Sequence, residues 1–175
     1  MYKLVRHFFT SIVLVLGLFL LLLTLPVTPA WAIVRNLEEK PGQMLYQSRQ
    51  TLLDNQGNTW QVVLFKRVKP DQSTETNLRL VGFPERDRFQ HPAPLIVATT
   101  PQNLSELRDV FATQSPEENV GQYDLAPVLG QLAMNNFWQL QLPLENPVTI
   151  TIPYYVQQEW QLVAPLSPLP EEKKL

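Results

Sequence analysis

Few residues in this sequence could do acid–base chemistry, and His91 is the first to consider. It is the only histidine outside the apolar N-terminal segment. A histidine general base needs a neighbouring acid to orient it, and Asp87 or Glu85 in the same loop could supply one. The stretch Phe89 to Pro94 is proline-rich, however, and a solvated histidine in a turn is the simpler interpretation. A lone histidine satisfies little of the required geometry, so we expect no catalytic residue.

Motifs for metal binding, serine hydrolysis and phosphate binding are missing from the sequence. With no cysteine and one histidine beyond the N-terminal segment, only carboxylates remain as metal ligands. Asp54 to Asn58 lacks the spacing and the distal glutamate of a calcium loop, so its glycine is expected to serve a turn. No serine lies in a Gly-x-Ser-x-Gly or Ser-x-x-Lys setting, and no glycine-rich phosphate loop is present. We therefore expect no metal, no cofactor and no enzymatic activity.

A set of basic side chains is the first candidate for contacting a partner. It comes from the end of one expected strand, from the next strand and from the following loop. Its members are Lys66, Arg67, Lys69, Arg79, Arg86 and Arg88. Strand pairing could bring these cations to one end of a sheet, which would suit a membrane surface or an acidic protein partner. Solvated strand ends, interleaved with Asp71, Glu85 and Asp87, are the favoured interpretation.

An aromatic cluster is the second candidate. It lies in the stretch "PYYVQQEW", Pro153 to Trp160. Tyrosine and tryptophan combine a large contact area with a polar tip and are enriched among interface anchors. Core packing explains Trp160 at least as well. Tyr154 or Tyr155 is therefore the residue that we expect to be exposed.

The N-terminal segment has the pattern of an export signal. Lys3 and Arg6 precede a nearly unbroken apolar run, Phe8 to Leu25, of 18 residues. This length lies between the apolar region of a signal peptide, about 7–15 residues, and a spanning helix of about 20. Two prolines then stop the helix, and Ala30 to Ala32 fits the small-x-small pattern that signal peptidase reads. We expect cleavage after Ala32, and retention as an anchor is the less favoured alternative.

Charge and composition limit the architecture and the partners of the chain that would remain after export. Residues 1–32 hold two of the 14 basic residues and none of the 16 acidic ones, so 143 residues with a net charge of −4 would remain. This length suits one domain with an ordinary core. Without cysteine the domain must be stable through packing alone. The acidic balance and export argue against nucleic acid as a partner.

Alternating and β-prone runs predict about six to seven strands. The expected strands of the first half are Tyr46–Leu53, Thr59–Val68, Thr76–Phe83 and Leu95–Thr99. The turn-rich stretch Asp54 to Asn58 predicts that the first two form a hairpin. The second run is apolar on both faces, which indicates a central strand. The expected strands of the second half are Trp138–Leu142, Val148–Ile152 and, less cleanly, Val156–Val163.

Two changes of period predict helices between these groups of strands. Asn103 with Glu106 has the spacing of a capping box, and apolar residues recur at helical spacing over Leu104–Thr113. Asp124 can cap a second helix, whose apolar face is Leu125, Val128, Leu129 and Leu132. The predicted fold is α+β: a mainly antiparallel sheet or open barrel of about six to seven strands, with two short helices inserted before the last strands.

Composition divides the chain into four parts. Residues 1–32 are the expected signal peptide, and residues 33–43 are a polar lead-in without periodicity. Residues 44–164 form the predicted strand-rich globular domain. Prolines spread residues 165–175 into a tail that we expect to be disordered.

Four stretches carry a resemblance to a known family. They read "PGQMLYQSRQTLLDNQGNTWQVVLFKRV", "NLRLVGFP", "HPAPLIV" and "IPYYVQQEWQ". In them the chain resembles a family of exported cyanobacterial proteins defined only as a domain of unknown function, over Pro41 to about Gln161. The family brings no established activity or site residues. What the resemblance implies is a compartment, either the periplasm or the thylakoid lumen.

Two functional hypotheses follow. The first is a non-enzymatic accessory protein of the lumen or periplasm that binds a membrane protein complex, with the photosynthetic apparatus as the first candidate, in assembly or stabilisation. The alternative is a protein that holds a small apolar ligand, a lipid or a pigment, near Trp60, Trp138 and Trp160. An apolar cavity beside these tryptophans would favour the ligand, whereas a filled core with an exposed aromatic or basic patch would favour the accessory role.

Overall fold

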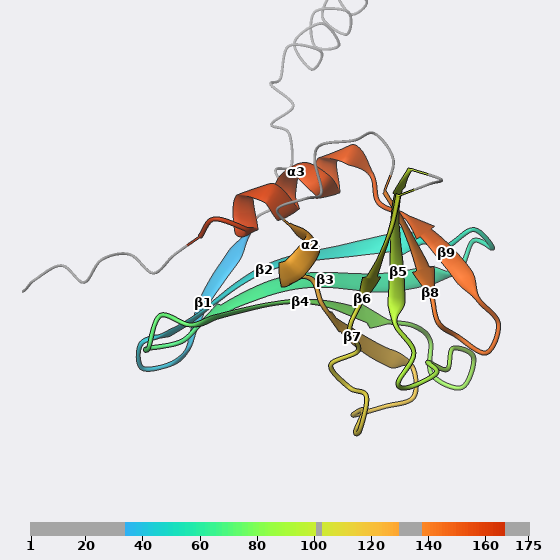
Figure 1. Ribbon diagram of the computed structural model, residues 1–175, viewed down its shortest axis with the longest axis horizontal. Coiled ribbons are helices and arrows are strands. Elements are labelled where there is room, and N and C mark those ends of the chain that lie inside the picture. Colours follow the sequence, from blue (N-terminus) through green and yellow to red (C-terminus); the bar gives the residue numbers. More distant parts are fainter. Residues whose placement is uncertain (1–33, 101–102, 130–137, 167–175) are drawn as a thin grey trace, which may run out of the picture. The chain divides into compact units, whose positions relative to one another are not determined.

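The computed structural model describes residues 34–100, 103–129 and 138–166. These residues form nine strands and two short helices (Figure 1). In chain order they are β1 (Arg35–Lys40), β2 (Gln43–Leu53), β3 (Thr59–Val68), β4 (Thr74–Val81), β5 (Leu95–Thr100), β6 (Asn103–Leu107), β7 (Val120–Asp124), α2 (Ala126–Leu129), β8 (Gln139–Leu142), β9 (Val148–Thr151) and α3 (Tyr154–Val163). The predicted class, α+β with mainly antiparallel strands, is confirmed, but the strands form two sheets rather than one.

The first sheet has the order β1-β2-β3-β4-β7, and all its pairs are antiparallel. β2 and β3 form the predicted hairpin, with Leu53 opposite Thr59 at its closed end. Gly57 has φ +84° in the connecting turn, a conformation that favours glycine. β3 is the central strand, as predicted. Trp60, Val62 and Leu64 on its inner face are fully buried, and Val63 and Phe65 on its other face are buried as well.

The second sheet has the order β6-β5-β8-β9, also antiparallel. Its strands cross those of the first sheet at a steep angle in Figure 1. One hydrophobic cluster takes side chains from both sheets and both helices. Its largest fully buried members are Trp60, Trp138, Trp160 and Tyr123. The core between the sheets is therefore built around aromatic rings, and Trp138 and Trp160 lie with their centroids 6.0 Å apart.

Helix α3 packs against β2 and β3. Val156, Trp160 and Val163 are fully buried on its inner side, at the i, i+4, i+7 spacing of one helix face. Two polar contacts attach the helix to the sheet. Gln50 Nε2 donates to Glu159 Oε2 at 2.6 Å, and Lys66 Nζ donates to the carbonyl oxygen of Ala164 at 2.6 Å, just beyond the last turn.

The structure corrects two predicted elements. The helix predicted over residues 104–113 is wrong, because its first part is strand β6, in which Leu107 lies opposite Leu95 of β5. The strand predicted over residues 156–163 is helix α3. One helix, α2, therefore precedes β8 and the other follows β9. In both segments the apolar residues fit a helical period and a strand period, and contacts with the rest of the domain determine which element forms.

The ends of the predicted domain also differ. Residues 35–40, expected to be an irregular lead-in, form the edge strand β1, which pairs with β2 from Arg35–Gln47 to Lys40–Gln43. All six residues of β1 are exposed, so no alternation of apolar and polar residues indicates the strand in the sequence. α2 confirms the start of the second predicted helix, where Asp124 Oδ1 accepts the N–H of Ala126 at 3.1 Å. The predicted cleavage site, the tail beyond residue 166 and Leu132 lie outside the described residues.

Candidate functional site

Helix α3 turns an uncharged side to solvent. Tyr154, Tyr155 and Leu162 are 45%, 55% and 61% exposed, and Gln158 between them is exposed too. We call these four residues the α3 outer face. Gln158 Nε2 donates to Tyr154 Oη at 3.3 Å. The single charged residue of the helix, Glu159, is only 4% exposed and faces inward. Both predicted tyrosines are thus exposed, beside Leu162, which no sequence motif marks.

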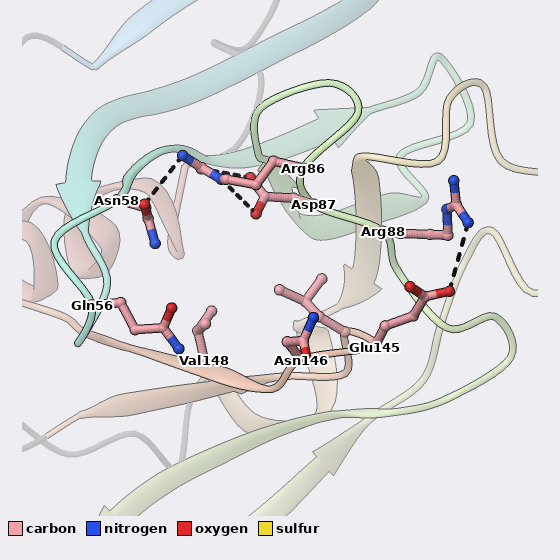
Figure 2. Close-up of a pocket in the computed structure, with 9 residues that line it drawn as sticks. Gln56, Asn58, Arg86, Asp87, Arg88, Glu145, Asn146 and Val148 are labelled. Carbon is pink, nitrogen blue, oxygen red and sulfur yellow. Dashed lines mark hydrogen bonds and ion pairs between the residues drawn. The ribbon is translucent and has the colours of Figure 1, made fainter.

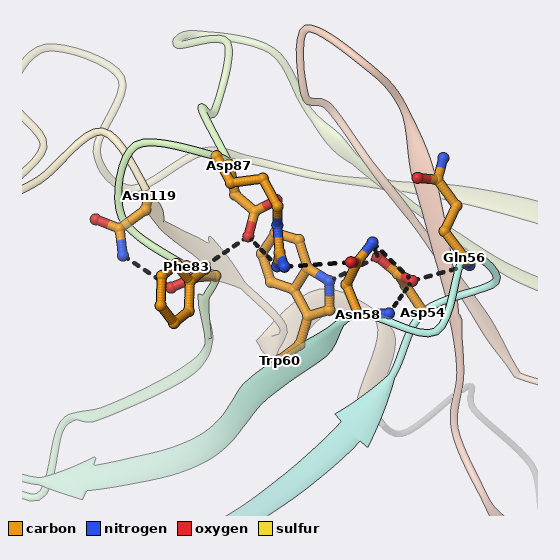
Figure 3. Close-up of polar contacts among 9 residues, drawn as sticks. Asp54, Gln56, Asn58, Trp60, Phe83, Asp87 and Asn119 are labelled. Atoms are coloured by element: carbon orange, nitrogen blue, oxygen red, sulfur yellow. Dashed lines mark hydrogen bonds and ion pairs between the residues drawn. The ribbon is translucent and has the colours of Figure 1, made fainter.

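A polar network surrounds Asp54, just after β2 (Figure 3). Asp54 is 7% exposed and accepts the indole N–H of Trp60 at 3.0 Å. It also accepts the backbone N–H groups of Gln56 at 2.9 Å and Asn58 at 2.8 Å. Burial favours a higher pKa for Asp54, but these hydrogen bonds to the carboxylate bring its pKa below the usual value. The network fixes both the turn and the indole at the start of β3.

The same network continues into the loop after β4. Arg86 Nη1 donates to Asn58 Oδ1 at 3.2 Å, and Arg86 also forms a two-point contact with Asp87, at 3.0 and 2.7 Å. Asp87 is 9% exposed and accepts the N–H of Phe83 at 2.6 Å. Asn119 Nδ2 donates to the carbonyl of Gly82 at 2.9 Å. The guanidinium of Arg86 is therefore held from two sides, by an acid and by an amide.

A polar pocket of about 110 Å³ lies in front of this network (Figure 2). Three turns form it: the β2–β3 turn, the loop after β4 and the β8–β9 turn. Its lining residues are Gln56, Asn58, Arg86, Asp87, Arg88, Leu144, Glu145, Asn146 and Val148. In Figure 2, Asn58 and the Arg86–Asp87 pair stand on one wall and face Gln56, Val148 and Asn146 on the other. We call this the turn pocket.

The strands do not bring the predicted basic set to one end of a sheet. Lys66 and Arg67 lie toward the end of β3, whereas Arg86 contacts Asn58, which precedes that strand. Arg88 is also on the pocket side, because it lines the turn pocket with Arg86. The antiparallel path of β4 separates the two groups, since the loop after β4 must lie where β3 begins.

Each arginine of the set has a specific partner. Arg67 Nε binds Glu39 Oε2 at 2.6 Å, and this hydrogen bond holds the pKa of Glu39 to about 2. Arg79 donates twice to Gln122 Oε1, at 2.9 and 2.6 Å. Arg67 and Arg79 also lie over the ring of Phe65, 5.5 and 5.4 Å from its centroid. These two arginines therefore cover the outer side of β3.

The remaining basic residues of the set also have partners. Lys69 forms an ion pair with Glu75 across the turn between β3 and β4. Arg88 Nε binds Glu118 Oε2 at 2.9 Å, and its Nη1 lies 3.6 Å from Glu145 Oε1. Burial lowers the pKa of Lys66, whose ammonium group is turned toward the end of α3. Carboxylates thus bind four cations of this set, whereas Lys66 binds a backbone carbonyl and Arg79 an amide oxygen.

His91 has a different partner from either acid that we proposed. Its Nδ1 lies 2.6 Å from Asp109 Oδ2, and the Asp109 side chain is 2% exposed. Asp109 Oδ1 also accepts the N–H of Phe111 at 2.8 Å. Asp87, one proposed partner, is occupied by Arg86 and the N–H of Phe83. The other ring nitrogen of His91 is buried and forms no hydrogen bond to the described residues, so the pair joins two loops rather than facing solvent.

Tyr123 lies beside this pair. It forms an isolated bridge with Asp109, and its ring centroid lies 6.2 Å from that of Phe89. Burial and the nearby Asp109 carboxylate raise the pKa of the Tyr123 hydroxyl. Across residues 34–100, 103–129 and 138–166, no group of three His, Cys, Asp or Glu side chains could hold a metal ion. In the same ranges no helix is long and apolar enough to cross a membrane.

Comparison with known proteins places the whole described domain in one family. The family described as "Protein of unknown function (DUF3122)" matches residues 32–163, a range that contains every strand and both helices of the described structure. No curated protein and no solved structure matches the chain. The resemblance inferred from the sequence to a domain of unknown function is confirmed. The chain belongs to the DUF3122 family.

Proposed function

We propose that this protein is an exported, non-enzymatic accessory protein that binds a membrane protein complex through the α3 outer face. The observation that carries the proposal is the lack of charge on that face. Tyr155 and Leu162, both more than half exposed, lie seven residues apart and thus on the same side of the helix. The carboxylate of Glu159 is turned into the domain instead.

Folding alone does not account for this face. A helix that only covers a sheet normally carries charged or polar residues on its solvent side. The inner side of α3 is already fixed by Val156, Trp160 and Val163 and by the contacts of Glu159 and Ala164 with the sheet. Depletion of charge and enrichment of tyrosine are the compositional marks of an interface core. A protein partner is the occupant that this composition suits.

Export rests on the N-terminal sequence. The positive start, the apolar run and the Ala30 to Ala32 pattern support transfer across a membrane with cleavage after Ala32. The family match begins at residue 32, beside this site. The lumen or periplasm as the compartment, and a photosynthetic complex as the partner, are the narrower form of the proposal. They rest on the resemblance to exported cyanobacterial proteins.

The alternative of a lipid or pigment site near the tryptophans has no support from their positions. Trp60, Trp138 and Trp160 are all 0% exposed. Each belongs to the continuous hydrophobic cluster. Their rings fill the core, so they present no surface on which an apolar ligand could lie. A filled core together with an exposed aromatic face is the combination that favours the accessory role.

Affinity purification from native membranes tests the proposal. The full chain carries a C-terminal tag, membranes are solubilised in mild detergent, and mass spectrometry identifies the recovered proteins and the N-terminus. We expect stoichiometric recovery of one membrane complex and a mature chain that starts at Ile33. Recovery of the protein alone would overturn the accessory function, and an intact N-terminus would overturn cleavage.

A matched pair of variants locates the interface. Leu162→Ser and Leu53→Ser remove side chains that are both 61% exposed, but Leu53 lies on β2 and outside the α3 outer face. We expect Leu162→Ser, and more strongly Tyr155→Ser, to reduce recovery of the complex by about tenfold or more, as truncation of an interface anchor does. Leu53→Ser should recover the complex normally. Equal recovery in all three variants would show that α3 is not the contact surface.

A further inference from the structure

The turn pocket has the features of a ligand site, and its charge is the first clue to the ligand. Arg86 and Arg88 contribute two positive charges to its lining, and Asp87 and Glu145 contribute two negative ones. Glu118, which binds Arg88 from outside the lining, adds a further carboxylate. Carboxylates therefore outnumber guanidinium groups around the pocket. An anionic ligand would have to displace Glu145 from Arg88 and approach the remaining acids.

Neutral amides supply the rest of the hydrogen-bonding capacity. Gln56, Asn58 and Asn146 each carry an amide group, which has both donors and an acceptor. The amide of Asn58 already binds Asp54 through Nδ2 and Arg86 through Oδ1, so it has one N–H and one oxygen lone pair left for a ligand. The three amides come from opposite walls of the pocket in Figure 2. A ligand whose own groups both donate and accept, as hydroxyl groups do, matches such a lining. A carboxylate only accepts and a phosphate ion at neutral pH mostly accepts, so either would leave much of this capacity unused.

The wall of the pocket that contains Asn58 and Arg86 is rigid. Arg86 is fixed by Asp87 and by the side-chain oxygen of Asn58, and these contacts use three of its five N–H groups. The backbone of Asn58 is in turn fixed by the buried Asp54. Prearranged polar groups bind a ligand at a lower entropic cost than mobile ones. This chain of contacts leads from the core at Trp60 to the rim of the pocket.

The size and the apolar part of the lining limit the ligand further. A volume of about 110 Å³ is well below the roughly 300–1,000 Å³ of pockets for drug-sized ligands. Leu144 and Val148, which are 4% and 7% exposed, give the pocket an apolar patch. A small ring with hydroxyl groups on its edge and C–H groups on its face suits this mixture.

We propose that the turn pocket binds a neutral, hydroxyl-rich ring, of the size of a single sugar residue. The amides of Gln56, Asn58 and Asn146 bind its hydroxyl groups, and Leu144 and Val148 contact its C–H face. Arg88 and Glu145 lie 3.6 Å apart at the rim and supply one further donor and one acceptor. The site is independent of the function proposed for α3.

Nuclear magnetic resonance titration of the exported chain tests the proposal. The probes are methyl glucoside and methyl galactoside, with sodium phosphate as the anionic comparison, each up to about 50 mM. We expect a glycoside to shift the side-chain amide signals of Gln56, Asn58 and Asn146 and to saturate with a Kd on the order of 1–10 mM, since one ring makes few contacts. Phosphate should cause no saturable shift of these signals.

A variant in an exposed turn completes the test. Asn146 is exposed between β8 and β9, so Asn146→Ala should fold normally, as an unchanged melting temperature would verify. It should weaken glycoside binding by about threefold or more, the equivalent of one hydrogen bond. Gln158→Ala, outside the pocket, should bind like the parent chain. Absence of saturable shifts with both glycosides, binding of phosphate alone, or unchanged affinity in Asn146→Ala would each overturn the proposal.

Discussion

Replacement of Asp54 by alanine should destabilise the domain more than the same replacement of an exposed aspartate in a similar turn. Asp54 accepts the indole N–H of Trp60 and the backbone N–H groups of Gln56 and Asn58. Trp60 is 0% exposed. When the carboxylate is removed, the indole N–H is left in the core without an acceptor, whereas the N–H groups of the turn can be hydrated.

The magnitude follows from these separate losses. An orphaned buried donor costs about 1–3 kcal/mol, and a hydrogen bond to a charged group contributes about 1.5–3 kcal/mol. Since water replaces part of the turn contacts, we expect Asp54→Ala to lower the free energy of unfolding by about 2–4 kcal/mol. For a domain of this size the melting temperature should fall by roughly 10 °C. Asp54→Asn keeps the side-chain shape and one acceptor, and its loss should be smaller.

Urea unfolding followed by tryptophan fluorescence measures the difference. Asp71→Ala is the matched control, because Asp71 accepts the N–H and the hydroxyl of Ser73 in a similar turn but is exposed. Its unfolding midpoint should match that of the parent chain. If Asp54→Ala shifted the midpoint no more than Asp71→Ala, the buried network would not be what fixes this turn, and our account of the pocket wall would be refuted.

The pKa shift of Asp54 also predicts how its contribution to stability depends on pH. The hydrogen bonds to Asp54 outweigh its burial and lower its pKa in the folded state. The stability that they confer is therefore present above the unfolded pKa of the carboxyl group, and it is lost as pH falls through the lower folded value. The difference in the free energy of unfolding between the parent chain and Asp54→Ala should accordingly become smaller in strong acid. A difference that widened there would contradict the sign of this pKa shift.

Two further predictions concern the first sheet. Glu39, whose pKa falls from 4.5 to about 2 beside Arg67, should stabilise the fold above pH 4.5 and lose that effect as pH falls toward 2. Glu39→Gln should thus lower stability by up to about 1 kcal/mol at pH 7 and by less at pH 2, which urea midpoints at both pH values would check. Gly121→Ala should cost about 1–3 kcal/mol by overpacking. The new Cβ would lie 2.7 Å from the ring of Phe89 and 2.9 Å from that of Tyr123, so an unchanged melting temperature would contradict this packing.

The sequence was informative where local chemistry and burial agree. The β2–β3 hairpin was predictable because a turn-rich stretch with Gly57 joins two β-prone runs. The central place of β3 was also predictable, since both of its faces are apolar. Here the residues that make the turn are also the residues that the tertiary structure needs. β5, β8 and β9 were predictable as well, because the apolar residues of their β-prone or alternating runs are the ones that the structure buries.

Where two periods coexisted, the sequence could not decide between them. In α3 the spacing of Val156, Trp160 and Val163 fits a helix, but Trp160 and Leu162 also alternate as in a strand. In β6 the spacing of Leu104 and Leu107 suggested a helix. The choice there depends on pairing with β5, which no local window contains. β1 had no hydrophobic signal at all, because both of its faces are exposed.

Site residues were predictable singly but not as a group. The β2–β3 turn and the loop after β4 were recognised as turns, yet nothing local indicated that they meet the β8–β9 turn. His91 stands out in the sequence, but its partner Asp109 is 18 residues away, outside the loop that contains His91. The exposure of Tyr154 and Tyr155 was foreseen from residue type, whereas their uncharged setting depends on Glu159 facing inward.

The two proposed sites have no residue in common, but both are attached to strand β2. Whether binding at one site affects binding at the other can therefore be tested. The α3 outer face belongs to a helix that Gln50 of β2 holds through Glu159, and Asp54 at the wall of the turn pocket follows the same strand. Independent sites require that Asn146→Ala leaves recovery of the complex unchanged and that Leu162→Ser leaves glycoside binding unchanged. If one variant altered both readouts, β2 would be the element that couples them, because it is the strand in contact with α3 that leads directly into the pocket turn. The domain would then bind its partner in a ligand-dependent way.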